Sequence, residues 1–111
     1  RLLLDPIVLP VSAAQDQSAA ALKAIGMFRS LSEPAPRTIV GLSNVSQGTT
    51  HRSLVNRTYL VMAMAAGLDA AILDPFDREL MDALRTAGIL LNQEIYAENY
   101  LESGSVVAVG A

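Results

Sequence analysis

Three short apolar runs, separated by long helical patterns, constrain the fold of this chain more than any other feature. Each run is apolar without regular polar alternation, which is typical of strands buried on both faces. The runs cover residues 2–9, which Asp5 and Pro6 interrupt, residues 37–42 and residues 70–73. Because the segments between them are too long for hairpins, we expect parallel strands joined by right-handed crossovers. The sequence therefore predicts an α/β fold.

Apolar residues at three- and four-residue spacing predict a helix after each run. The predicted helices cover residues 14–32, 53–67 and 77–92. Gly67 is placed to end the second helix, and Asp77 is a good N-cap for the third. The residues expected on the apolar stripes are Ala21, Leu22, Ile25, Phe28 and Leu31, then Leu54, Leu60, Val61, Met64 and Ala65, and finally Leu80, Met81, Leu84, Ala87 and Leu91.

Past the third helix the pattern weakens. A further short helix is expected at residues 94–101, with Ile95, Tyr96 and Tyr100 on its apolar side. Residues 103–111 match no element, and we interpret them as a tail. The chain is then a single unit over residues 1–102 followed by that tail.

Composition excludes several classes of function. The chain has 111 residues, 51% of them hydrophobic, which suffices for one core. Its net charge of -3 provides no basic surface for nucleic acid or anionic membranes. With no cysteine and one histidine, disulfides, thiolate metal sites and cysteine nucleophiles are excluded, and no metal site is expected. The longest apolar stretch, residues 59–68, is too short to span a membrane, so we expect a cytoplasmic protein.

Polar side chains follow all three predicted strands at the point where each strand ends. They are Asp5, the cluster from Ser43 to Gln47, and Asp74. Carboxyl ends of parallel strands share one edge of the sheet, and that edge holds the ligand in α/β folds. Uncharged amides and hydroxyls suit a neutral heterocycle. The alternative is a βα turn whose Ser and Asn side chains bond their own backbone and cap the next helix.

Periodicity leaves two architectures open. Three βα units can belong to an open doubly wound sheet, or they can be somewhat under half of a (β/α)₈ barrel, which needs about 250 residues. The chain opens at Arg1 inside an apolar run, so we expect it to be a fragment.

Several spaced motifs resemble the pterin-binding methyltransferases, in particular those acting between methyltetrahydrofolate and a corrinoid/iron-sulfur protein. The resemblance covers residues 1–101. The motifs are Asp5-Pro6-Ile7-Val8-Leu9-Pro10, Ala14-Gln15-Asp16, Gly41-Leu42-Ser43-Asn44-Val45-Ser46-Gln47 with Arg52, Asn56-Arg57-Thr58, and Ala65-Ala66-Gly67-Leu68-Asp69-Ala70-Ala71-Ile72. It implies that the chain is the last three βα units of a (β/α)₈ TIM barrel. Pterin contacts from earlier strands would then lie outside this chain.

The resemblance also implies roles for particular residues. Asp5 matches the aspartate that hydrogen-bonds the pterin ring, and Asn44 matches the asparagine that approaches the nitrogen bearing the methyl group. Ser43 and Gln47 match further pterin contacts of the same loop. Arg52 matches a position that either meets a folate carboxylate or braces the loop. His51 matches no motif position, and no role is assigned to Asp74.

The implied activity is transfer of the N5-methyl group of methyltetrahydrofolate to the cobalt of a corrinoid. Cobalamin is expected on a partner corrinoid (iron-sulfur) protein, and the other partner is the remainder of the barrel. We expect the full-length protein to be a homodimer and the isolated chain to be inactive. Two alternatives stay open: a folate-binding module of the cobalamin-dependent methionine synthase type, and a non-catalytic scaffold subunit of a split barrel.

Overall fold

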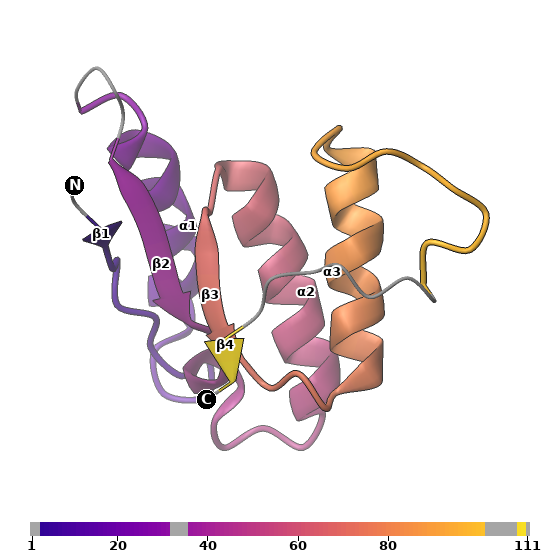
Figure 1. Cartoon of the computed structure of the whole chain (residues 1–111). Helices are drawn as coiled ribbons and strands as arrows, with labels where there is room; N and C mark the ends of the chain where they lie inside the picture. The colour runs from indigo at the N-terminus through magenta and orange to yellow at the C-terminus, as the bar shows by residue number, and fades with distance from the viewer. Residues whose placement is uncertain (1–2, 32–35, 102–108, 111) are drawn as a thin grey trace.

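A computed structural model describes residues 3–31, 36–101 and 109–110 of the chain. Strands and helices alternate along it (Figure 1). In chain order they are β1 (Leu3–Leu4), α1 (Gln15–Phe28), β2 (Arg37–Gly41), the short 3₁₀ helix η1 (Leu42–Ser46), α2 (Arg52–Ala66), β3 (Ala70–Leu73), α3 (Arg78–Leu90) and β4 (Val109–Gly110). The predicted alternation of strands and helices is confirmed.

All the described strands are parallel, and their order in the sheet is β1-β2-β3-β4, the order of the sequence. Right-handed crossovers that always step in one direction place every helix on the same face. Figure 1 accordingly shows α1 behind β2, with α2 and then α3 next to it on the right. A doubly wound sheet would reverse its strand order and carry helices on both faces. The sequential order is that of a barrel segment, and it is also that of one half of a doubly wound sheet, whose order reverses only at its switch point.

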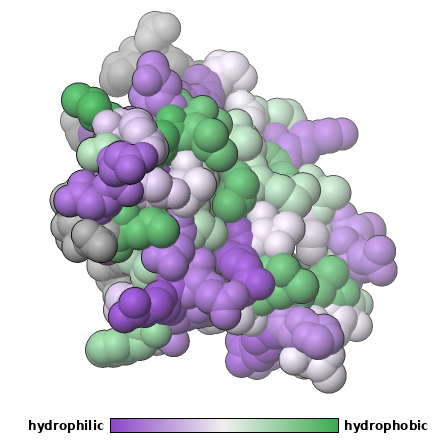
Figure 2. All heavy atoms as spheres, turned by 90° about the vertical axis from the view of Figure 1, so that its right-hand side faces the viewer, coloured by the Kyte–Doolittle hydropathy of each residue, from purple (hydrophilic) through white to green (hydrophobic). Residues whose placement is uncertain are grey.

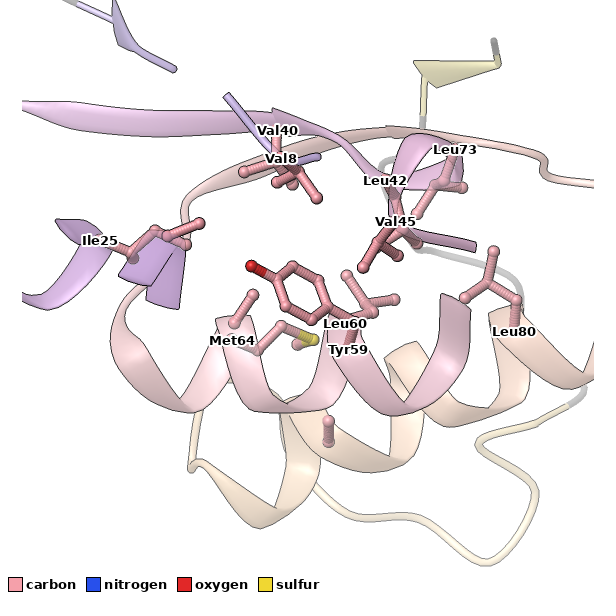
Figure 3. Close-up of a cluster of buried hydrophobic side chains, with 13 residues drawn as sticks. Val8, Ile25, Val40, Leu42, Val45, Tyr59, Leu60, Met64, Leu73 and Leu80 are labelled. Atoms are coloured by element: carbon pink, nitrogen blue, oxygen red, sulfur yellow. The ribbon is translucent and has the colours of Figure 1, made fainter. Parts of the chain in front are cut away.

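The core lies between the sheet and the helices (Figure 3). Side chains alternate along β2, so Thr38 and Val40 are buried under the helices while Ile39 and Gly41 lie on the other face. From α2, Leu60 and Met64 pack against this layer. The core side chains labelled in Figure 3 are Val8, Ile25, Val40, Leu42, Val45, Tyr59, Leu60, Met64, Leu73 and Leu80.

Tyr59 joins α2 to α1 within this core. Its hydroxyl donates a hydrogen bond to the Ser18 carbonyl at 2.9 Å. Burial raises the pKa of Tyr59, because the tyrosinate form would lose its hydration. The apolar body and one polar tip of tyrosine fit a position between two helices.

Two helix ends follow the predicted signals. Gly67 has a φ of 115°, and its amide donates to the Ala63 and Met64 carbonyls at the end of α2. Only glycine adopts that left-handed conformation without a steric cost. The Asp77 carboxylate accepts a hydrogen bond from the Leu80 amide at 3.1 Å and caps α3. Both predictions are confirmed.

Five of the residues predicted for the apolar stripes are exposed rather than in the core: Leu31, Leu54, Val61, Ala65 and Leu91. Leu54 is 50% exposed, because the inner face of α2 is formed by Tyr59, Leu60, Ala63 and Met64. Leu31 is exposed, since α1 ends at Phe28 rather than at residue 32. The four residues that follow Leu31, Pro34 among them, lie in the undescribed range 32–35.

The predicted helix at residues 94–101 is wrong. The structure has turns and bends there, with the Ile95 side chain 94% exposed. A short helix needs an apolar face to pack, and residues 94–99 are exposed to solvent. The segment is instead tied to α3, where the Arg85 Nη1 donates to the Leu101 carbonyl at 2.7 Å. Figure 2 shows this side of the molecule, where apolar residues form separate groups among hydrophilic ones.

Part of the predicted tail is a strand. Val109 and Gly110 form β4, with Ile72 opposite Val109 and Leu73 opposite Gly110. The open edge of β3 offers unpaired backbone groups that a following segment can bond. The other residues of 103–111 lie outside the described part of the chain. Within the described residues, no helix is both long and apolar enough to cross a membrane.

Candidate functional site

Three loops meet the carboxyl edge of the sheet, as the sequence predicted. Residues 5–14 follow β1, η1 and residues 47–51 follow β2, and residues 74–77 follow β3. The strands point the same way in Figure 1, so these loops lie at one end of the molecule. Asp5, Asn44 and Asp74 therefore share an edge, each at the end of a different strand.

Asp5 opens a tight turn after β1. Its Oδ1 accepts a hydrogen bond from the Ile7 amide at 2.9 Å, and Pro6 fixes the backbone between them. Ile7 has a φ of 56°, which is an outlier for a β-branched residue. Such strained residues cluster at functional sites. The other carboxylate oxygen of Asp5 has no partner among the described residues, and the residue is exposed to solvent.

The turn after β3 repeats this arrangement. Asp74 Oδ1 accepts from the Phe76 amide at 2.9 Å, with Pro75 between them. The two Asp-Pro sequences thus form the same aspartate-to-amide hydrogen bond at two strand ends of one edge, although the φ is positive at Ile7 and not at Phe76. This turn is also a common structural one, so its geometry alone assigns neither aspartate to a ligand.

The η1 segment carries the Asn44 side chain at the edge. Leu42 and Val45 are buried and hold the segment to the core, while Ser43 and Asn44 are exposed. The Nδ2 of Asn44 donates a hydrogen bond to the Val8 carbonyl in the loop after β1. The structure therefore brings the loops of Asp5 and Asn44 into direct contact.

Arg52 holds the same segment from the first turn of α2. Its Nε donates to Ser46 Oγ at 3.0 Å, and its Nη2 donates to the Ser43 carbonyl at 2.9 Å. These bonds support the bracing role among the two considered for Arg52. The side chains of Ser43 and Gln47 are exposed at the edge, with no hydrogen bond to other described residues.

The expected helix cap is not formed by this cluster. The residue preceding α2 is His51, and no side chain caps the helix there. The Ser46 hydroxyl donates instead to the Ser43 carbonyl at 3.2 Å. The alternative interpretation is thus half correct: the loop bonds its own backbone, but it does not cap α2.

Gly41 leaves open space at the end of β2. A Cβ added there would meet no atom within 4 Å, so packing among the described residues does not require glycine. Gly41 lies on the sheet face away from the helices, just before Ser43 and Asn44. A flat ligand can approach a glycine backbone more closely than any other residue allows.

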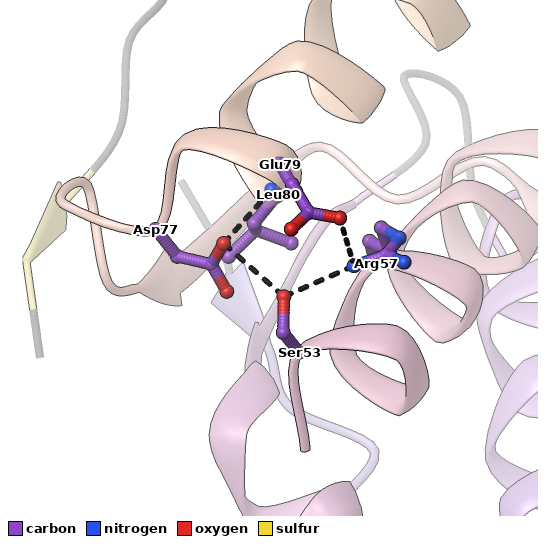
Figure 4. Close-up of polar contacts among 5 residues, drawn as sticks. All are labelled: Ser53, Arg57, Asp77, Glu79 and Leu80. Carbon is purple, nitrogen blue, oxygen red and sulfur yellow. Dashed lines mark hydrogen bonds and ion pairs between the residues drawn. The ribbon is translucent and has the colours of Figure 1, made fainter. Parts of the chain in front are cut away.

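Sequence reasoning missed a second polar network at this edge (Figure 4). Ser53 Oγ donates to Asp77 Oδ1 at 3.2 Å, and Arg57 Nη1 donates to Ser53 Oγ at 3.1 Å. Arg57 also pairs with Glu79 at 3.0 Å. This network joins the first two turns of α2 to the first turn of α3. Only the capping function of Asp77 could be predicted, because contacts between helices leave no local pattern.

Other features lie away from the edge. A cavity of about 210 Å³ is lined by α2, α3, β3 and the segment after α3, including Leu60, Met64, Leu84 and Asp69. Asp69 stands just before β3, and its carboxylate accepts from the Thr38 amide at 2.8 Å. Among the residues that the structure describes, no group of three or more His, Cys, Asp or Glu side chains could hold a metal ion.

Comparison with known proteins finds similarity to a methyltransferase. No family model matches the chain. Over 60 residues it is 35% identical to the methylcorrinoid:tetrahydrofolate methyltransferase of Eubacterium limosum. That match covers 54% of this chain and 22% of the relative's length. The chain is thus similar, over about half its length, to part of an enzyme named for methyl transfer between a corrinoid and a folate.

Proposed function

We propose that this chain is part of a pterin-binding barrel in a cytoplasmic enzyme that moves a methyl group between N5 of tetrahydrofolate and a corrinoid protein. The similarity to the methylcorrinoid:tetrahydrofolate methyltransferase supports the reaction class. The parallel sheet in sequential order is compatible with a barrel. The relative is named for transfer from the corrinoid to the folate. Both directions share one transition state, so the residues described here have the same tasks in each.

The contact between the Asp5 and Asn44 loops carries this proposal. Asp5 keeps one carboxylate oxygen available at the edge, and a carboxylate accepts N–H groups such as those of an amino-pyrimidinone ring. Asn44 stands in the adjacent loop, joined to the first by its bond to the Val8 carbonyl. Asp5 thus anchors the pterin ring, while Asn44 reaches the reacting nitrogen. Gln47 and Ser43 add uncharged contacts from the same side.

Asn44 is suited to assist the nitrogen that loses the methyl group. A tertiary amine leaves only if it gains a proton or a strong hydrogen bond as the carbon–nitrogen bond breaks. The Asn44 side-chain nitrogen carries two hydrogens, and one of them bonds to the Val8 carbonyl. The second hydrogen is available to the leaving nitrogen while the first keeps the amide in place. A neutral amide also avoids placing a charge beside the substrate before reaction.

The corrinoid supplies the cobalt that takes or gives the methyl group. We place it on the partner protein, and the edge residues of this chain bind and orient the folate. His51, the one histidine, is the exposed residue that precedes α2. Its side chain makes no hydrogen bond to the three loops among the described residues. No cobalt ligand is proposed from this chain.

The remaining strands are proposed to come from the rest of a longer protein, which we expect to be a homodimer. Ile39 and Gly41 of β2 lie on the sheet face without helices. In a barrel that face is the packed interior. The matched part of the relative is 22% of its length, which leaves ample chain for the other strands. The 111-residue chain alone then lacks part of the pterin pocket, and we expect no turnover from it.

Binding of methyltetrahydrofolate tests this function. In the full-length protein containing this chain, Asp5→Ala should raise the Kd for methyltetrahydrofolate about 10-fold to 100-fold, because a hydrogen bond to a charged group is lost. The measurement is a fluorescence titration. Asp82→Ala is the control, since Asp82 lies within α3, outside the three edge loops.

Equal affinities of Asp5→Ala and the unaltered protein would contradict the anchoring role. Absence of binding by the unaltered protein would favour the scaffold alternative. A homocysteine-binding domain elsewhere in the same protein would favour the methionine synthase type.

A further inference from the structure

Three hydrogen bonds join the loop after β1 to the loop after β2 along their length. Asn44 Nδ2 donates to the Val8 carbonyl. The Val11 amide donates to the Val45 carbonyl at 2.9 Å. Ser12 Oγ donates to the Gln47 carbonyl at 2.7 Å. The bonds follow in the same order along both loops, so the loops lie side by side in a defined register.

Ser12 differs from the other two donors because its hydroxyl also lies over Gly48. Gly48 has a φ of 84°, and a Cβ added there would lie 2.8 Å from Ser12 Oγ. The Ser12 side chain is exposed and adds nothing to the apolar core. Its contribution to the fold is therefore the hydrogen bond to Gln47 and the space that it fills beside Gly48.

The hydrogen bond from Ser12 affects the Asn44 segment through one residue, Gln47. Gln47 accepts from Ser12 with its carbonyl, and its own amide donates to the Asn44 carbonyl at 3.3 Å. Displacement of Gln47 would therefore also change the turn that presents Asn44. A loop that carries site residues needs such support, because a displacement of those residues by about 1 Å is enough to weaken a site.

We propose that Ser12 is a positioning residue, which holds Gln47 and Asn44 in register with the Asp5 loop. This inference rests on the proposed function for the identity of the ligand, a reduced folate. It adds that the loop after β1 and the loop after β2 form one preorganised unit before the ligand binds. Preorganisation raises affinity because less ordering remains to be done on binding.

Ser12→Ala tests this in two measurements. In the 111-residue chain, hydrogen exchange at the amides of Gln47 and Thr49 should become about threefold to tenfold faster, as expected for loss of one neutral hydrogen bond. In the full-length protein, the Kd for methyltetrahydrofolate should rise by a similar factor. Ser12→Thr keeps the hydroxyl and should restore both values.

Ser30→Ala is the matched control. Ser30 Oγ also donates to a carbonyl, that of Met27, at 2.8 Å, but it does so just beyond the end of α1 and far from the site loops. It should leave exchange at Gln47 and the folate affinity unchanged. Any general effect of losing a serine hydroxyl would appear in both variants.

The outcomes separate this inference from the proposed function. Unchanged exchange at Gln47 in Ser12→Ala would overturn the positioning role, whatever the folate result. Faster exchange together with no folate binding by the unaltered protein would uphold the loop register and contradict the proposed function. Faster exchange with an unchanged folate Kd would overturn the claim that the register prepares the site.

Discussion

Replacing Asn44 by alanine in the full-length protein that contains this chain is expected to slow methyl transfer about 100-fold to 1000-fold, which is the usual cost of removing one preorganised donor. The Kd for methyltetrahydrofolate should rise by less than about threefold, because the assistance grows only as the carbon–nitrogen bond breaks. Single-turnover kinetics at saturating folate measure the first quantity, and a fluorescence titration measures the second.

Two comparisons make the Asn44→Ala result specific. The alanine variant also loses the bond to the Val8 carbonyl, so its thermal unfolding must be measured alongside. Gln93→Ala removes an exposed amide in the segment after α3, away from the three edge loops, and should be neutral in all three assays. Equal losses in transfer rate and in folate affinity would contradict the role of Asn44 at the leaving nitrogen.

Leu60→Ala is expected to lower the free energy of unfolding by about 2 to 5 kcal/mol, the range for removing a buried leucine side chain. Leu60 is 1% exposed and lies in the middle of α2, against the sheet. Loss of its side chain leaves a cavity that the surrounding core residues fill only partly. Urea denaturation of the 111-residue chain, followed by circular dichroism, measures the change.

Leu54→Ala is the matched control on the same helix. The sequence pattern placed Leu54 and Leu60 on one apolar stripe, whereas the structure exposes half of Leu54. An exposed substitution of this kind should change the free energy of unfolding by about 0.5 kcal/mol or less. Similar losses for both variants would show that the face of α2 assigned to the core is wrong.

The elements with strong local signals could be predicted from the sequence. The strand at residues 70–73 was predicted with the bounds the structure has, because it is an unbroken apolar run between a glycine-ended helix and an Asp-Pro turn. Gly67 and Asp77 were recognised for the same reason, since each acts on the backbone a few residues away. The helix expected at residues 94–101 failed because only tertiary packing could have stabilised it.

The candidate site could be predicted only in part. Parallel strands place Asp5, Asn44 and Asp74 at one edge, and the polar sequence from Ser43 to Gln47 marked the loop. No sequence pattern indicates the contact of Ser12 with the Gln47 carbonyl or that of Asn44 with the Val8 carbonyl. Their acceptors are backbone atoms about 35 residues away, and any residue type offers a carbonyl.

Methyl transfer itself is the most direct measurement of the proposed function. The full-length protein is mixed with methyltetrahydrofolate and cob(I)alamin under reducing conditions, and the cobalt absorbance is followed. We predict that methylcobalamin and tetrahydrofolate form at a rate proportional to the protein concentration, and that the 111-residue chain alone forms neither. A full-length protein that leaves both compounds unchanged, and that also fails to transfer the methyl group from methylcobalamin to tetrahydrofolate, would contradict the proposed activity.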